Sequence, residues 1–164
     1  MKKLKTGIML FIILFLLWLL LAGINRDELI IGGVTALILS ILFTPKVSII
    51  GCVSLHPKAI FYFIIYIFVF LKELVMSTLD VTRRVLSRQL PINPGIVKVR
   101  TKLKCPLGRI VLANSITLTP GTMTVETRGE YFYIHWIDIQ SDDIQETTEA
   151  IVSTFEKYLE VIFD

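Results

Sequence analysis

The 164-residue sequence lacks the residue patterns on which most enzyme and metal sites depend. It has only two cysteines, Cys52 and Cys105, without a CxxC pair, so it predicts neither a disulfide framework nor a zinc site. It has no glycine-rich phosphate loop, and the serine and threonines of 115–122 lack the histidine and aspartate that would activate a nucleophile. We therefore expect no catalytic residue, metal or cofactor site within this chain.

Charge is also scarce, at 19% of residues, whereas hydrophobic residues make up 54%. An ordinary soluble domain has about 25% charged residues and roughly 45–50% apolar ones. The apolar excess lies almost entirely in the first half, which excludes a disordered chain and a plain soluble globule. The sequence predicts three apolar membrane helices within residues 1–88 and a small α+β extramembrane domain over residues 89–164.

The first apolar segment contains twenty uncharged residues between Lys5 and Arg26. A helix of that length is about 30 Å long, which matches the hydrocarbon thickness of a bilayer. The lysines before it would also suit a signal peptide, but the apolar run is long for one and no small-residue cleavage site follows. We predict a membrane helix over residues 6–25.

The second segment, residues 29–45, follows so closely that the two helices must form a tight hairpin. Its small residues Gly32, Gly33 and Ala36 would let it pack closely against a neighbouring helix, and Pro45 would end it. The third segment covers residues 58–80 and continues to Leu86 as an amphipathic helix. The predicted apolar face of that extension comprises Leu71, Leu74, Val75, Thr78 and Val85.

Lys72 and Glu73 are a candidate intramembrane charged pair, because charges inside apolar segments are costly and often functional. They lie near the far end of the third segment, so they would equally reach the membrane surface or pair with a partner subunit. The positive-inside rule does not decide the orientation, because the two sides would carry similar numbers of Lys and Arg.

Charge is distributed unevenly over the second half of the chain. Residues 80–129 hold nine basic and two acidic residues, whereas residues 130–164 hold one basic and nine acidic residues. These segments would neutralise each other within one folded domain, or the basic one would contact anionic lipid. Aromatic residues are not interleaved with the basic ones, which argues against nucleic-acid binding.

The C-terminal domain begins after a linker at Pro91 and Pro94. Residues 97–104 alternate between apolar and basic, which predicts a strand with one basic face. A short helix or a strand follows, then a type II turn at 119–122, a hairpin through Arg128 and Gly129, and a final helix over 144–162. The predicted order is β-α-β-β-α. His135 lies within a hairpin strand and is interpreted as structural.

The stretch from Leu112 to Thr122, followed by the run from Tyr133 to Ile137, resembles the E-type subunit of the Mrp-type multisubunit Na+/H+ antiporters. The likeness extends over nearly the whole chain. It marks a candidate structural or docking motif, whose key residues are Asn114, Thr119, Pro120, Gly121 and Thr122.

The resemblance implies a non-catalytic accessory subunit that supports assembly and ion transport in the plasma membrane. Its C-terminal domain would be cytoplasmic. Its partners would be the other small and large membrane subunits and lipids, in an obligate hetero-oligomer with no nucleic acid. Similar modules in membrane-bound hydrogenases and sulfur-reducing complexes are an alternative. A stand-alone membrane-anchored domain that binds lipid or protein is an alternative of another class. Because this domain of about 70 residues is small for independent stability, we expect partners or membrane to cover its apolar surface.

Overall fold

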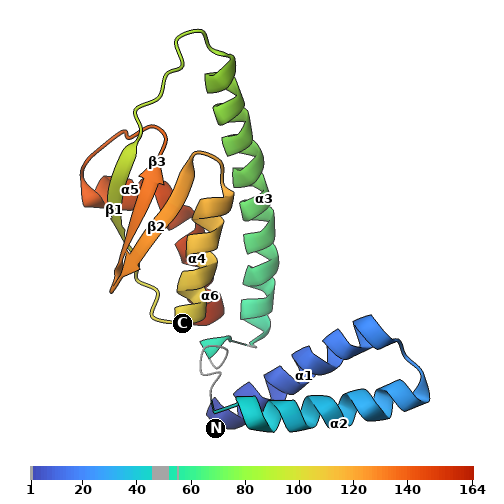
Figure 1. The fold of residues 1–164 in the computed structure, drawn as a ribbon. Coiled ribbons are helices and arrows are strands. Elements are labelled where there is room, and N and C mark those ends of the chain that lie inside the picture. Colours follow the sequence, from blue (N-terminus) through green and yellow to red (C-terminus); the bar gives the residue numbers. More distant parts are fainter. Residues whose placement is uncertain (1, 46–51, 55) are drawn as a thin grey trace. The chain divides into compact units, whose positions relative to one another are not determined.

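The computed structural model describes residues 2–45, 52–54 and 56–164 and divides into two compact units, Met1–Cys52 and Val53–Asp164 (Figure 1). The first unit contains helices α1 (Lys2–Ala22) and α2 (Arg26–Phe43). The elements of the second unit, in chain order, are α3 (Pro57–Leu86), β1 (Gly95–Arg100), α4 (Pro106–Leu118), β2 (Thr122–Arg128), β3 (Tyr131–Trp136), α5 (Ile144–Ile151) and α6 (Ser153–Phe163).

Helices α1 and α2 form the predicted hairpin, with a tight connection at Gly23, whose φ is +96°. The buried residues of α2 are the small ones Gly32, Ala36 and Ser40. A Cβ atom at Gly32 would lie 2.3 Å from Cδ1 of Trp18, so the Trp18 ring lies directly on the α2 backbone. The predicted close packing through Gly32 and Ala36 is therefore confirmed.

Within the described residues, two helical stretches are long and apolar enough to cross a membrane, Leu4–Ala22 in α1 and the whole of α3. Helix α2 has 18 residues, and Arg26, Asp27 and Glu28 give its first turn three charges. The apolar helices thus exist where they were expected, while the number that span the bilayer, and the division at residues 88 and 89, stay predictions.

The second unit contains a three-stranded antiparallel sheet in the order β1-β3-β2. The predicted hairpin between β2 and β3 is present, and Gly129 at its tip has a φ of +55°. Strand β1 ends at Arg100, earlier than predicted, although Thr101 and Leu103 continue the alternating burial.

The hydrophobic core lies between one face of this sheet and helices α4, α5 and α6. Helix α5 packs on β1 and α4 packs on β2, while α6 packs on both α4 and α5. The largest fully buried core side chains are Phe132, Leu112, Ile116, Ile134, Leu159, Val99 and Val152. The single final helix that was predicted is wrong, because the chain breaks at Val152 into α5 and α6. This break lets α5 cover the sheet while α6 turns onto α3 and α4.

Helix α3 forms a layer outside α6 (Figure 1). Aromatic side chains fill the contact between the two helices. The Phe155 ring lies 6.5 Å from the Tyr66 ring and 6.4 Å from the Phe70 ring. The Tyr66 hydroxyl hydrogen-bonds the Ser115 hydroxyl of α4. The third apolar segment is thus part of the same compact unit as the sheet.

The predicted linker at 91–94 is held firmly against the end of β3. The Asn93 backbone N–H donates to the Ile137 carbonyl at 3.0 Å, and the Ile139 N–H donates to the Asn93 carbonyl at 2.9 Å. Both cysteines are disulfide-bonded in the structure, which the cysteine pattern did not predict.

Candidate functional site

A cavity of about 200 Å³ lies beside the second, C-terminal half of α3. Helix α3 contributes Glu73, Ser77, Asp80 and Arg84 to its wall. The opposite wall is formed by the turn at 119–122, the end of β3 with the residues that follow it, and parts of α5 and α6. The cavity therefore brings one member of the predicted charged pair, Glu73, together with the predicted turn motif.

The turn at 119–122 has the geometry that its residues predicted. The Thr122 N–H donates to the Thr119 carbonyl at 3.3 Å, and Gly121 has a φ of +95°, as the third residue of a type II turn requires. The Thr119 hydroxyl donates to the Ser115 carbonyl at 2.5 Å and the Thr122 hydroxyl to the Ile116 carbonyl at 2.6 Å, which ties the turn to the end of α4. The Gly121 carbonyl accepts from the Ile137 N–H at 2.8 Å, so the turn also holds the end of β3.

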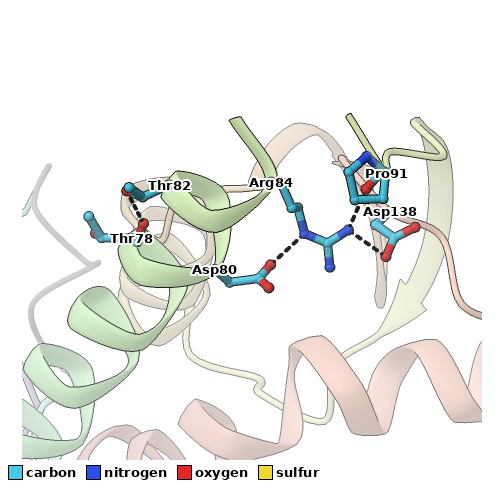
Figure 2. Close-up of polar contacts among 6 residues, drawn as sticks. All are labelled: Thr78, Asp80, Thr82, Arg84, Pro91 and Asp138. Atoms are coloured by element: carbon cyan, nitrogen blue, oxygen red, sulfur yellow. Dashed lines mark hydrogen bonds and ion pairs between the residues drawn. The ribbon is translucent and has the colours of Figure 1, made fainter. Parts of the chain in front are cut away.

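Arg84 connects α3 to the rest of the unit (Figure 2). Its Nε donates to Oδ2 of Asp80 at 2.7 Å, one helical turn away. Its Nη1 donates to Oδ2 of Asp138 and to the Pro91 carbonyl, both at 2.8 Å. The Arg84 side chain is only 18% exposed, and its bonds join α3, the linker and the segment after β3.

The other candidate residues lie elsewhere. Lys72 is on the open side of α3 with 71% of its side chain exposed, and its Nζ lies 3.5 Å from Oε1 of Glu73. Asn114 is exposed and lines an open depression of about 590 Å³ with Lys104 and Arg109. The structure thus separates Lys72 and Asn114 from the cavity that Glu73 and the turn share.

Carboxylates dominate the cavity electrostatically, because Glu73, Asp80 and Asp138 face a single guanidinium, Arg84. No group of three or more potential metal-ligating side chains occurs in the described parts of the chain. Hydrogen bonds within the protein already hold Asp80 and Asp138. What this arrangement does best is to fix α3 against the sheet.

The basic and acidic segments meet within the domain. Nη2 of Arg100 lies 2.9 Å from Oε2 of Glu130, which raises the pKa of the Arg100 guanidinium. The buried Glu156 carboxylate accepts from the Thr101 hydroxyl at 2.5 Å and from the Lys102 N–H at 2.8 Å. The Arg100–Glu130 and Arg84–Asp138 ion pairs favour the interpretation in which the two segments neutralise each other. His135 is exposed on the sheet face opposite the core.

Arg84 and Asp138 were missed as site residues. The spacing of Asp80 and Arg84 was a usable signal, since residues four apart on a helix face each other. Asp138, 54 residues away from Arg84, left no such signal.

The family model described as Na+/H+ ion antiporter subunit, MNHE, matches residues 11–162. The E-type subunit of a Na(+)/H(+) antiporter from Alkalihalophilus pseudofirmus is 38% identical over 104 residues, which cover 59% of this chain and 66% of that protein. A second such subunit, of type E1, from Staphylococcus haemolyticus is 31% identical over 153 residues, which cover 88% of this chain and 89% of that protein.

Among solved structures, a chain of the membrane-bound sulfane sulfur reductase, an archaeal respiratory membrane complex, is 43% identical with a TM-score of 0.82. The match covers 96% of this chain and 99% of that one. The family match extends over both units, from within α1 almost to the end of α6. The chain therefore belongs to the MNHE family of Na+/H+ ion antiporter subunits.

Proposed function

We propose that this chain is an accessory subunit of a multisubunit Na+/H+ antiporter in the cell membrane. The observation that carries the proposal is the family match over residues 11–162. The large apolar side chains exposed along α1, α2 and α3 support it, because a chain alone in water would not leave so much apolar surface open. Lipid and partner subunits would cover that surface.

The role we assign is assembly rather than catalysis or ion conduction. Along the apolar stretch Leu4–Ala22 of α1, charge is limited to Lys5, whereas an ion pathway needs polar groups across the whole membrane. We assign Glu73 and the turn at 119–122 to a structural joint that sets the position of α3. We place residues 89–164 on the cytoplasmic side, as the family resemblance implies.

Affinity purification of the tagged chain from its native membranes, followed by blue-native electrophoresis and mass spectrometry, tests the assignment. We expect a large complex that contains many-helix membrane subunits. Migration of the chain only as a monomer would contradict the proposal. In liposomes, the isolated chain should give no sodium-dependent proton flux above empty vesicles.

A second assembly is favoured by one specific observation, the 43% identity to a chain of the sulfane sulfur reductase complex. In that case the chain would serve the antiporter module of a respiratory complex. The same purification separates the two assemblies, because redox subunits would then accompany the membrane subunits.

A further inference from the structure

Helix α3 has one covered side that runs along nearly its whole length. The partly or fully buried positions recur every three or four residues, which is the spacing of a single helical face. They are Ala59, Tyr62, Ile65, Tyr66, Val69, Phe70, Glu73, Leu74, Ser77, Val81 and Arg84. The contact extends from the aromatic side chains near the start to Arg84, which binds Asp138 and Pro91 (Figure 2).

The opposite side of α3 is apolar and open, and we call it the outer stripe. Its large side chains are between 48% and 81% exposed. At 100° per residue they lie within about 60° of the direction facing away from the domain. The outer stripe consists of Ile60, Phe61, Ile64, Phe68, Leu71, Val75, Leu79 and Leu86.

The two threonines that interrupt the outer stripe do not make it polar. The Thr78 hydroxyl donates to the Leu74 carbonyl at 2.6 Å. The Thr82 hydroxyl donates to the Thr78 carbonyl at 2.7 Å, as Figure 2 shows. Because these hydroxyls bond back to their own helix, they need no partner outside it.

In the C-terminal half of α3, polar side chains face the domain and apolar side chains face outward. A helix on the surface of a soluble domain has the opposite arrangement. Glu73, Ser77 and Arg84 face the domain, whereas Leu71, Val75 and Leu79 face outward. Water on the outer side would favour the opposite arrangement, so the outer stripe requires an apolar neighbour.

A bilayer-spanning α3 is incompatible with this packing, although its length and composition alone would allow it. Polar residues of the sheet domain, such as Thr119, Asp138 and Gln140, line the cavity beside the second half of α3, and a spanning helix would carry them into the hydrocarbon. A helix that lies along the membrane surface avoids that cost, because its covered side stays in water while its apolar side enters the lipid.

The charges on α3 fit an anionic surface. Lys58, Lys72 and Arg83 fall within about 40° of one another on one flank of the outer stripe, by the same 100° per residue. All three are exposed, whereas Glu73 is half-buried on the domain side and the exposed Asp80 is paired with Arg84. Lysines and arginines beside an apolar stripe reach the headgroups of anionic lipids.

We propose that α3 is an in-plane amphipathic helix whose outer stripe lies in the lipid interface of an anionic membrane leaflet and attaches the sheet domain to it. The proposal rests on the membrane location of the chain but not on the antiporter assignment. It replaces the predicted third span with a surface-bound helix.

Depth measurement by electron paramagnetic resonance tests this proposal on the full chain in vesicles of zwitterionic and anionic phospholipid. A spin label attached through p-acetylphenylalanine, which leaves the native cysteines intact, is introduced in turn at Ile60, Phe68, Val75 and Leu86. Relaxation by oxygen and by a water-soluble nickel chelate then gives the depth of each label. The same scan at Ile8, Ile12, Leu16 and Leu20 of α1 provides the profile of a candidate span.

We expect the four α3 labels to lie at one shallow depth, about 5–10 Å into the headgroup and acyl boundary. The α1 labels should instead pass through the bilayer centre. A steady depth change along α3, whose labelled positions span about 39 Å of helix, would overturn the proposal in favour of a spanning helix. Labels accessible to the nickel chelate but not to oxygen in the lipid would overturn it in favour of water, and labels shielded from both would overturn it in favour of a protein contact.

A charge-removing variant tests whether anionic lipid contributes to the binding of α3. Replacing Lys58, Lys72 and Arg83 together by Gln should move the α3 labels toward water and abolish the difference between anionic and zwitterionic vesicles. The depth of the α1 labels should not change. An unchanged α3 profile in this variant would overturn the assignment to anionic lipid. If purification later shows no antiporter subunits, the depth profile still stands, so the two proposals fail separately.

Discussion

The hairpin of α1 and α2 and the contact between α3 and α6 bury their helices with different kinds of side chain. In the hairpin the contact residues of α2 are small, Gly32, Ala36 and Ser40. At the α3 contact they are large and aromatic, with Tyr66 and Phe70 around Phe155. Small residues are typical of helices in lipid, where close backbone approach replaces the hydrophobic effect.

Aromatic packing around a buried core is instead typical of a domain that folds in water. The second unit combines that core with an apolar outer stripe, so it has the interior of a soluble domain and one surface suited to lipid. Exposed apolar residues therefore do not by themselves mark a membrane span. What distinguishes the two cases is what covers the other side of the helix.

The largest effect is expected from Phe155→Ala, which empties the contact between α3 and α6. Phe155 is 4% exposed, and truncation of a buried Phe costs about 3–5 kcal/mol. Guanidinium unfolding in detergent, followed by circular dichroism, measures this loss. Phe68→Ala removes the same ring from the outer stripe, where it is 68% exposed, and should cost less than about 0.5 kcal/mol in detergent. Equal losses would contradict the assignment of the two sides of α3.

Gly32→Leu should break the hairpin by a different mechanism. Even the Cβ atom would lie 2.3 Å from the Trp18 ring, so α1 and α2 must separate or Trp18 must move. We expect a cost of roughly 1–3 kcal/mol, as for other overpacked sites. A donor and an acceptor dye at the open ends of the two helices, near Gly7 and Thr44, would report the separation as a loss of energy transfer.

Gly33→Ala is the matched control, because its Cβ has only an ordinary contact of 3.9 Å with Phe15. Trp18→Ala should restore the energy transfer of Gly32→Leu by making room for the leucine. Loss of transfer in the control, or no rescue, would show that the contact at Gly32 is not what closes the hairpin.

Much of this arrangement was predictable because local rules governed it. Apolar runs located α1, α2 and α3, and alternation located β1. Pro120 and Gly121 specified the type II turn, since only a residue that tolerates a positive φ fits its third position.

The side of α3 that faces the domain was not predictable. In the first half of α3, Tyr66 and Phe70 are covered while Ile64 and Phe68 are exposed. All four side chains are large and mainly apolar, so hydropathy does not alternate between the two faces there. In the second half of α3, residues 71–86, apolar residues do recur with a helical spacing. That spacing does not show whether the apolar face packs on the domain or points away from it. Leu71, Val75 and Val85 of that face are exposed, and polar residues form the contact instead. Such long-range choices depend on Asp138 and Phe155, far along the chain.

Gly121→Val should strain the turn that lines the cavity. A β-branched residue at a φ of +95° is strained, and its Cβ would lie 3.1 Å from Cγ2 of Ile137. We expect a loss of about 1–3 kcal/mol and less of the chain recovered in the complex. Gly121→Asn should be milder, because Asn tolerates left-handed geometry. Recovery of both variants at the wild-type level would contradict a packed joint.

The smallest effect is expected where α3 is held by charge. Arg84→Leu removes the bonds to Asp138 and the Pro91 carbonyl from a guanidinium that is 18% exposed. Partial exposure screens the pair, so we expect a loss of about 1 kcal/mol in detergent. Arg83→Leu, at the next position but exposed, is the control and should be close to neutral. Unfolding of both variants by guanidinium at fixed pH measures the difference.

A double-mutant cycle with Asp138→Asn shows whether this loss comes from the contact itself. If Arg84 and Asp138 act through their 2.8 Å bond, the double variant should lose less stability than the two single variants together. Added salt should reduce the coupling free energy between Arg84 and Asp138 only slightly. Their side chains are only 18% and 28% exposed, so salt ions screen the pair weakly. Full additivity would mean that the aromatic contacts alone hold α3, and that Arg84 merely follows the position they set.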